Sequence, residues 1–388
     1  MNLPTLLEKT KQLFIRKFST PCSGIASCPG RINILGEHTD YTGGLSIPAA
    51  INRWTLVAYG PAKRNKITFW SENFQDFYSP DLSNNNGPGK SWQKFLHATL
   101  KCLLLEFPLN KKKGVNLLIY GTVPLGKGLS SSASLELALL HALNSHFQLK
   151  LQDQEMVNLA KKIENDYLKV PSGFLDQYAC QYSKTHKINK IDFENLTIES
   201  SEIEPLEGMV WVCIDSGIKR RLAASEYSTR VDQCFEFLKL VSSQFPSVKT
   251  FRDVESAHLD SIKDLTLKRR ARHMLSENRR TQHGFHALID GDWLELGRLL
   301  NKSHASLSQD YEVSCQELDF LQSTAVTHGA CLGSRMMGGG FGGCTLNLVK
   351  AEIGTNFATD VTERYYKHCG IKADYYVLQM VEGARTHK

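Results

Sequence analysis

The chain has 388 residues, of which 41% are hydrophobic and 22% are charged. This is the composition of an ordinary globular protein, and it excludes an intrinsically disordered chain. The net charge of +6 is spread along the chain, so no basic tail and no nucleic-acid partner are indicated.

The length predicts two domains, each large enough to bury its own core. No apolar run approaches the ~18 residues that span a bilayer, and the first twenty positions lack the pattern of a secretory signal. The ten cysteines form no CxxC spacing, so reduced thiols are expected rather than a zinc site. These features predict a cytoplasmic protein without a membrane partner.

The first half of the chain predicts short strands alternating with helices. Stretches rich in β-branched and aromatic residues predict strands at 50–59, 66–70 and 114–120. Apolar residues at helical spacing predict helices at 91–107, 132–147 and 153–168.

The second half predicts a strand at 209–215, followed by several helices and then by further strands. The helices are expected at 223–244, 266–290 and 292–308, and the later elements are a strand–loop–strand around Gly338, a helix at 356–369 and a strand at 373–379. Strands before and after a run of helices favour an α+β fold over a doubly wound sheet. The acidic, turn-like stretch 199–208 predicts a boundary near residue 205, and thus domains at 1–205 and 206–388.

The segment Val123–Ser134, with the sequence VPLGKGLSSSAS, stands between a predicted strand and a predicted helix. Glycines let a backbone approach a ligand, and a helix N-terminus offers unpaired N–H groups to an anion. The three serines add hydroxyl donors, so the segment favours a phosphate site. A serine-capped helix after a tight turn is the alternative. A P-loop is excluded, because Gly128 stands where that motif needs Ser or Thr.

A second segment, Cys28–Gly44, holds charged and polar residues between glycines. Its sequence is CPGRINILGEHTDYTGG, with Arg31, Glu37, His38 and Asp40 as the chemically active side chains. Donors and acceptors gathered on a turn suit a ligand with many hydroxyl groups, such as a sugar. A surface hairpin with solvated charges is the alternative.

Two further features have weaker signals. Gly333–Thr345 contains a formal GxGxxG, but a strand rather than a helix is predicted after it, which excludes a dinucleotide fingerprint. Two interpretations of this segment stay open: a loop that supports or closes over a phosphate site, and a flexible glycine turn. The carboxylates Glu164 and Asp176 are each typical of a salt bridge when considered alone.

Taken together, these segments occur in the order and spacing of the GHMP small-molecule kinases. Gly30–Gly44 resembles the signature GRxNxxGEHxDYxxG of the members that phosphorylate galactose, Pro124–Ser134 resembles the family's PxGxGLSSSAS loop, and Gly338–Gly343 is similar to its GGGFGG motif. Two more stretches, at 216–227 and 304–315, support the same branch. The resemblance spans residues 20–380.

The resemblance implies a two-domain α+β fold. Its N-terminal domain would hold a mixed sheet with a left-handed crossover, as in ribosomal protein S5. Its C-terminal domain would be ferredoxin-like, and the active site would lie in the cleft between them. The activity implied is transfer of the γ-phosphoryl group of ATP to O1 of galactose with Mg²⁺, the first committed step of galactose use. A monomer is expected, with a dimer as the alternative.

The resemblance also implies a role for individual residues. Asp176 would be the base facing the anomeric hydroxyl, and Arg31 would pair with it. The sugar would be bound by Glu37, His38, Thr39, Asp40, Gly173 and Tyr227. The nucleotide would be bound by Ser71, Gly126, Lys127, Gly128, Leu129, Ser130, Ser131 and Ser132. Ser132 and Glu164 would hold Mg²⁺.

Two stretches depart from the family pattern, and two other functions stay open. Lys127 stands where relatives have a small residue, and Phe174-Leu175 replaces Ile-Met before Asp176. The alternative functions are a kinase for another hexose or for N-acetylgalactosamine, and a non-catalytic galactose sensor. Such sensors lose the Ser-Ala step of the phosphate loop, which is present here at Ser132-Ala133.

Overall fold

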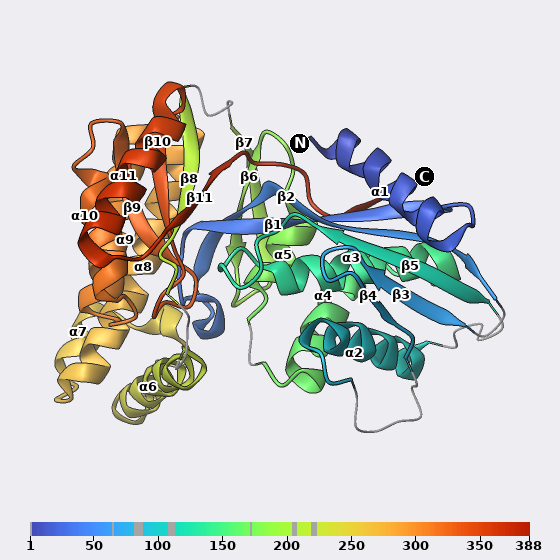
Figure 1. Ribbon diagram of the computed structural model, residues 1–388. Helices are drawn as coiled ribbons and strands as arrows, with labels where there is room; N and C mark the ends of the chain where they lie inside the picture. The colour runs from blue at the N-terminus through green and yellow to red at the C-terminus, as the bar shows by residue number, and fades with distance from the viewer. Residues whose placement is uncertain are drawn as a thin grey trace.

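The computed structural model describes residues 2–63, 66–80, 88–107, 113–170, 173–203, 208–218 and 223–388, except the side chains of 223–225. Two lobes, each built on its own sheet, lie side by side (Figure 1). No helix in these ranges is long and apolar enough to cross a membrane.

The first lobe is a mixed sheet covered by helices on both faces. Its strands run in the order β12-β1-β2-β5-β3-β4, with β6 paired to β2 and β7 paired to β6. The strands are β1 (Gly24–Leu35), β2 (Leu45–Ala62), β3 (Ile67–Ser71), β4 (Asp76–Tyr78), β5 (Gly114–Gly121), β6 (Lys187–Asp192), β7 (Thr197–Glu202) and β12 (Arg385–His387). The pair β3 and β5 is parallel, and the connection between these two strands runs through β4 and a helix.

Helix α1 (Leu3–Phe18) packs on one face of this sheet, and the other helices of the lobe lie on the opposite face (Figure 1). These are α2 (Ser91–Glu106), α3 (Ser131–Phe147), α4 (Asp153–Lys162), the π-helical turn Ile163–Tyr167 and α5 (Leu175–Tyr182). Strand β1 is buried along its whole length because both faces of the sheet are covered.

The second lobe is an antiparallel sheet with strand order β11-β8-β10-β9. Its strands are β8 (Met209–Asp215), β9 (Cys331–Met337), β10 (Cys344–Lys350) and β11 (Asp374–Leu378). Its helices are α6 (Ala223–Gln244), α7 (Ser256–Asp260), α8 (Leu265–Ile289), α9 (Trp293–Gln309), α10 (Gln316–Val326) and α11 (Gly354–Cys369). Numbered within the lobe, the strand order is 4-1-3-2, as in a ferredoxin-like fold.

The two lobes share an apolar core. Ile32 and Ile47 of the first sheet belong to the same buried cluster as Trp211, Phe285 and Leu346 of the second lobe. The chain also crosses back, because β12 at its far end pairs with β1 (Figure 1, dark red). Buried apolar contacts therefore fix the two lobes relative to each other, and with them the walls of the space between.

The mixed α+β architecture predicted from the sequence is confirmed. The predicted helices and strands at 66–70, 91–107, 114–120, 209–215 and 223–244 lie within a residue or two of α2, α6, β3, β5 and β8. The predicted strand at 50–59 is only part of the much longer β2, and the predicted helix at 153–168 ends in a π-helical turn.

Three expectations need correction. The segment with Arg31 was expected as a turn, but its first part is the buried strand β1, and the turn begins only at Gly36. Part of the predicted boundary stretch is strand β7, which pairs with β6. The boundary at 205/206 itself lies outside the described residues, and residues 385–387, expected in the second domain, belong to the first sheet.

Candidate active site

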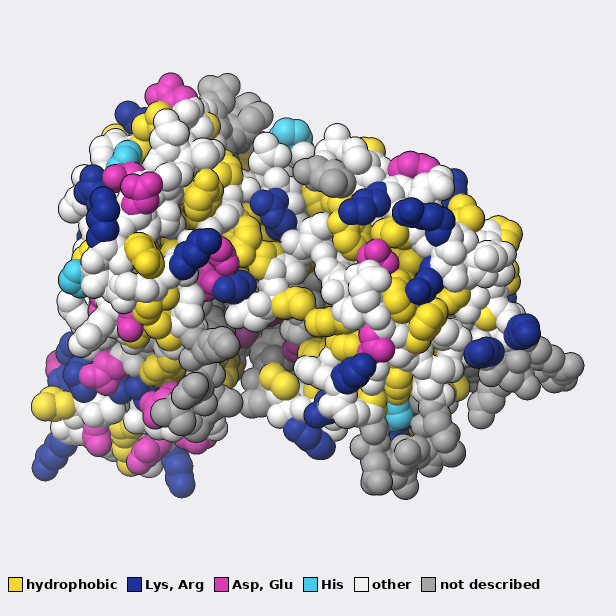
Figure 2. All heavy atoms as spheres, viewed as in Figure 1, with side chains coloured by type: hydrophobic (Ala, Val, Ile, Leu, Met, Phe, Trp, Pro, Cys, Tyr) yellow, Lys and Arg dark blue, Asp and Glu magenta, His cyan; other side chains and the backbone are white. Residues whose placement is uncertain are grey.

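A cavity of about 430 Å³ opens between the two lobes. It is lined by Arg31, Glu37, His38, Asp40, Gly126, Gly128, Ser130, Ser131, Ser132, Val170, Gly173, Leu175, Asp176, Tyr227, Gly338 and Gly339. In the space-filling view the molecule is hollowed between the lobes, while Lys and Arg side chains are scattered over this face without forming a patch (Figure 2). The three glycine-containing segments singled out in the sequence thus meet in one cavity.

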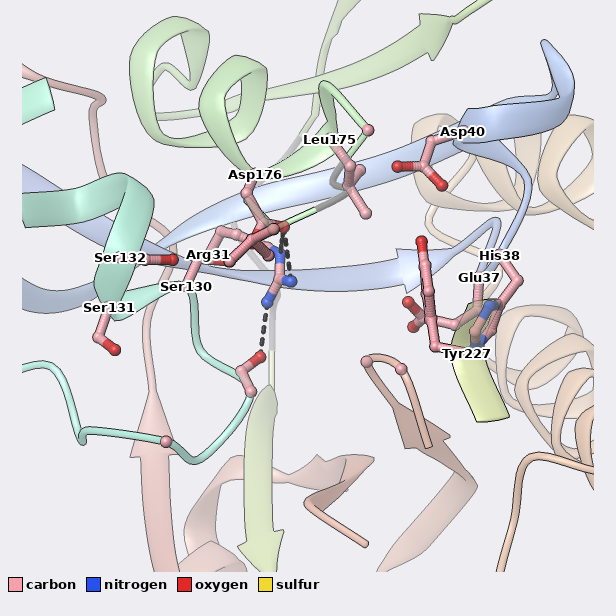
Figure 3. A pocket seen from close by; sticks show the side chains of 16 residues that line it. Arg31, Glu37, His38, Asp40, Ser130, Ser131, Ser132, Leu175, Asp176 and Tyr227 are labelled. Atoms are coloured by element: carbon pink, nitrogen blue, oxygen red, sulfur yellow. Dashed lines mark hydrogen bonds and ion pairs between the residues drawn. The ribbon is translucent and has the colours of Figure 1, made fainter. Parts of the chain in front are cut away.

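One wall of the cavity is the loop between β5 and the N-terminus of α3. Gly126 and Gly128 have φ angles of 71° and 75°, which favour glycine, and Ser130 before the helix has a φ of 57°. Ser131 and Ser132 form the first turn of α3 and face the cavity (Figure 3). The Ser130 Oγ is buried without a hydrogen-bond partner among the described residues. Unpaired N–H groups and hydroxyls at a helix N-terminus suit a phosphate.

The centre of the cavity holds an ion pair between Arg31 of β1 and Asp176 of α5. Arg31 Nε and Nη2 lie 2.9 Å and 2.6 Å from Asp176 Oδ1, and Arg31 Nη1 donates to the Gly128 carbonyl at 2.6 Å. Burial alone would lower the Arg31 pKa, but the charges of Asp176 and Glu37 outweigh it and raise that pKa. Arg31 therefore stays charged and ties the Asp176 carboxylate to the phosphate loop.

The opposite wall carries polar groups from both lobes, namely Glu37, His38, Asp40 and Tyr227 (Figure 3). Asp40 lies against the backbone of Gly173, where a Cβ atom would stand only 1.8 Å from Asp40 Oδ2. His38 Nδ1 is 3.0 Å from the Tyr41 hydroxyl, while its Nε2 is buried without a hydrogen-bond partner in the described part of the chain. Carboxylate, imidazole and phenol groups at one wall can bind several hydroxyls at once.

Burial and neighbouring charges set the protonation states at this wall. Limited access to water, with the charges of Asp176 and Glu37, raises the pKa of Asp40 to about 6. Burial lowers the pKa of His38 to about 3, so its ring is neutral near pH 7. Burial also raises the pKa of Tyr227 well above its ordinary value, which keeps the phenol protonated. The wall therefore offers both hydrogen-bond donors and acceptors.

Five residues expected in the site do not line this cavity. Thr39 is buried and donates to the carbonyls of Gly36 and Leu45, so it shapes the turn instead. Leu129 packs in the core shared by the lobes. Ser71 is buried at the end of β3, where its Oγ accepts the Phe74 N–H at 3.3 Å. Glu164 is buried in the π-helical turn, and its Oε2 accepts a hydrogen bond from Gln177 Nε2 at 2.8 Å.

Lys127 is the fifth of these residues. Its ammonium group forms an ion pair with the buried Asp215 of β8 and lies 3.9 Å from Asp374 of β11. The contact with Asp215 raises the Lys127 pKa. In this structure the side chain joins the phosphate loop to the second lobe, and phosphate binding by Lys127 stays a prediction.

Sequence reasoning missed several residues of the site. Val170 and Leu175 line the cavity, although an apolar residue carries no signal of its own for ligand binding. Gly338 and Gly339 lie in the glycine segment that the sequence had singled out without assigning a contact. Glu136 on α3 is fully buried, and no described residue bonds to either of its carboxylate oxygens. The signal that could have found it is the apolar character of its neighbours one helical turn away, Ala133, Leu139 and Leu140.

In the described part of the chain, no three His, Cys, Asp or Glu side chains gather as a metal site. A Mg²⁺ ion that is held partly by phosphate oxygens needs fewer protein ligands than that. Burial, followed by the charges of Glu164 and Asp176, raises the pKa of Glu136 well above its ordinary value. The fold therefore brings the charges of Glu164 and Asp176 to act on Glu136.

Comparison with known proteins gives consistent matches. Residues 94–184 match the GHMP kinases N terminal domain, residues 12–61 the galactokinase galactose-binding signature, and residues 285–367 the GHMP kinases C terminal domain. The galactokinase of Limosilactobacillus reuteri is 34% identical over 96% of this chain and 98% of its own length. That of Lactococcus lactis subsp. cremoris is 37% identical over 92% and 90%.

A solved structure agrees with these matches. The crystal structure of Lactococcus lactis galactokinase complexed with galactose superposes with a TM-score of 0.88, at 34% identity, and covers 98% of this chain and 99% of its own.

Proposed function

Since the chain belongs to the galactokinases of the GHMP kinase family, we propose that it transfers the γ-phosphoryl group of ATP to O1 of galactose. The observation that carries this proposal is the position of Asp176. Its carboxylate is fixed by Arg31 between the phosphate loop and the polar wall, where a sugar hydroxyl and a terminal phosphate would meet.

In the proposed reaction Asp176 takes the proton of the O1 hydroxyl, and O1 forms a bond to the γ-phosphorus while the bond to the β-phosphate oxygen breaks. Arg31 orients the carboxylate and neutralises charge next to the transferred group. The N–H groups and hydroxyls at the start of α3 bind the phosphates. Phosphoryl transfer needs mainly positioning and charge neutralisation, and these residues supply both.

The galactose hydroxyls would be bound at the wall formed by Glu37, His38, Asp40 and Tyr227. Family resemblance assigns O3 and O4 to Asp40, whose two oxygens can accept from adjacent hydroxyls. Glucose differs at the C4 position, so it would leave this carboxylate short of a donor. An unmet charged group costs about 1–3 kcal/mol or more, which predicts a strong preference for galactose.

Mg²⁺ would be held by Ser132 and Glu164, and it would neutralise the charge of the ATP phosphates. Hydroxyl and carboxylate oxygens are ligands that this ion takes. Ser132 lines the cavity, and Glu136 stands one helical turn further along α3. The Glu164 charge acts on Glu136, which supports a position of Glu164 near the same turns. The residues present therefore fit this ion.

The cytoplasm is the proposed location, because all ten cysteines are free thiols. The reaction is tested with a panel of monosaccharides: galactose, glucose, N-acetylgalactosamine and 2-deoxygalactose, each with Mg-ATP. ADP release is measured for each sugar, and phosphorus NMR locates the new phosphate. Galactose 1-phosphate is expected as the main product. A higher kcat/KM for another sugar, or sugar binding without ADP release, would overturn the proposal.

A further inference from the structure

Glu37 of the sugar-binding wall is held at three points by the second lobe. Arg335 Nη2 donates to Glu37 Oε2 at 2.6 Å, His273 Nε2 donates to the Glu37 carbonyl at 3.1 Å, and Glu277 Oε1 accepts the Glu37 N–H at 3.4 Å. The side chain, the carbonyl and the amide of one residue are thus all bonded to residues far along the chain.

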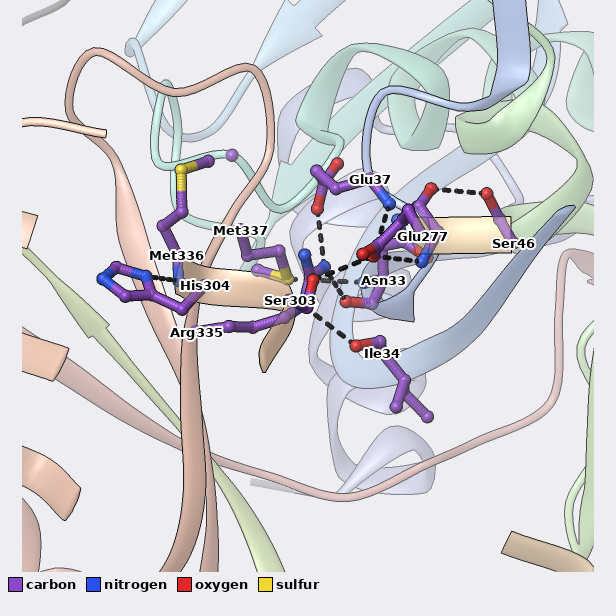
Figure 4. A network of polar contacts seen from close by, with 12 residues as sticks. Asn33, Ile34, Glu37, Ser46, Glu277, Ser303, His304, Arg335, Met336 and Met337 are labelled. Atoms are coloured by element: carbon purple, nitrogen blue, oxygen red, sulfur yellow. Dashed lines mark hydrogen bonds and ion pairs between the residues drawn. The ribbon is translucent and has the colours of Figure 1, made fainter. Parts of the chain in front are cut away.

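Arg335 of β9 is the centre of this arrangement (Figure 4). It is fully buried, and it also donates through Nε to the Ile34 carbonyl at 2.9 Å and through Nη2 to the Asn33 carbonyl at 2.6 Å. A planar guanidinium can serve several acceptors in fixed directions, which an ammonium group cannot. One side chain of the second lobe therefore fixes both the end of β1 and the carboxylate that follows it.

Glu277 of α8 fixes the turn from the other side. Its Oε1 also accepts the Gly36 N–H at 3.0 Å and the Ser303 hydroxyl at 2.8 Å, while its Oε2 accepts Arg280 Nε at 2.7 Å. Burial would raise the Glu277 pKa, but Arg280 and the other nearby cations lower it to about 2. The carboxylate is thus charged near pH 7 and accepts hydrogen bonds from two consecutive backbone N–H groups of the turn.

Glu37 can contact a bound sugar, whereas the residues that hold Glu37 cannot. Glu37 lines the cavity, whereas Arg335, Glu277 and His273 do not and have relative exposures of 0%. They can act on a bound sugar only through the residue that they hold. Because Gly338 and Gly339 follow Arg335 closely, the glycine segment contributes to the cavity in two ways: its loop lines the space, and its preceding strand orients Glu37.

We propose that Arg335, together with Glu277 and His273, positions the Glu37 carboxylate for the sugar, so that the sugar pocket is assembled by contacts from the second lobe. This inference rests on the proposed function in one respect, namely that the wall formed by Glu37, His38, Asp40 and Tyr227 binds a sugar. An unsupported carboxylate at this wall would rotate or draw in water, and the sugar would lose a fixed acceptor.

The test is a double-mutant cycle on sugar binding. The variants are Arg335→Lys, Glu37→Gln and the double variant, and the ligand is galactose or whichever monosaccharide the panel identifies as substrate. Arg335→Lys keeps the buried positive charge next to Glu37. We expect its sugar Kd, measured by calorimetry, to rise at least tenfold while the KM for ATP changes less than threefold. In the Glu37→Gln background, adding Arg335→Lys should raise the sugar Kd less than threefold.

Arg298→Lys is the matched control, since Arg298 pairs with Glu295 on the exposed side of α9. It should leave both constants unchanged. The inference is overturned if Arg335→Lys keeps the sugar Kd within twofold of wild type, if it weakens sugar binding equally in both backgrounds, or if ATP binding falls as much as sugar binding. A wild type that phosphorylates no sugar would instead reject the proposed function, which separates the two failures.

Discussion

Gly173→Ala is expected to damage sugar binding through Asp40. The added Cβ atom would stand 1.8 Å from Asp40 Oδ2 and 2.5 Å from its Cγ, whereas ordinary contacts begin at 3.4 Å. The Asp40 carboxylate must therefore move by roughly 1.5 Å, and misplacement by about 1 Å costs on the order of 10²-fold in rate. The Gly173 backbone is not left-handed, so alanine adds no strain of its own.

The assay compares kcat/KM for galactose with the Kd of ATP. We expect kcat/KM for galactose to fall about 10²-fold and the Kd of ATP to stay within threefold. Gly329→Ala is the control, because a Cβ atom there meets nothing within 4 Å and its backbone is also not left-handed. In an Asp40→Ala background, Gly173→Ala should lower kcat/KM for galactose little further, because the clashing carboxylate is gone. An equal fold loss of kcat/KM for galactose in both backgrounds would refute the reasoning.

Three more predictions concern the base, the metal and the titration of Asp40. Asp176→Ala should lower kcat by about 10²–10⁴-fold with an unchanged circular dichroism spectrum, and near-native turnover would exclude Asp176 as the base. Ser132→Ala and Glu164→Ala should each shift the Mg²⁺ titration of activity to higher concentration, and unchanged curves in both would remove them from the metal site. Because the Asp40 pKa is raised from 3.8 to about 6 in the folded protein, folding binds a proton between these pH values and stability falls as pH rises through them. Asp40→Asn lacks this loss, so its Tm at pH 7 should exceed that of wild type although galactose turnover is lost. The Tm of the variant minus that of wild type should therefore be larger at pH 7 than at pH 4, and a smaller difference at pH 7 would contradict the assignment.

Local patterns predicted much of the fold because they carry its strongest physical signals. Helix α2 shows helical periodicity, and β5 is a short, mostly apolar stretch, so both could be assigned without tertiary information. Strand β1 was missed as a strand because its glycines and its arginine read as a turn. Its burial comes from helices on both faces, which a sequence window cannot contain.

The candidate site divides in the same way. Arg31, Glu37, His38 and Asp40 lie within one short segment, and a recognisable signature pointed to them. Arg335 and Glu277 were not found, because their contacts with Glu37 join positions 298 and 240 residues apart. The unusual state of Glu136 was not predicted either, because it arises from burial and then from the charges of Glu164 and Asp176, which belong to other elements of the fold.

The pairing of β12 with β1 affects how the chain is made. Ser27 of β1 bonds to His387 of β12 across 360 residues, with Oγ 2.8 Å from the histidine Nε2. During synthesis β1 leaves the ribosome 360 residues before this neighbour does, so its edge near Ile25 and Ser27 stays open over that interval. Open strand edges invite pairing with other chains, so this interval exposes the chain to aggregation. The first sheet is therefore completed only after all four strands of the second sheet have been made.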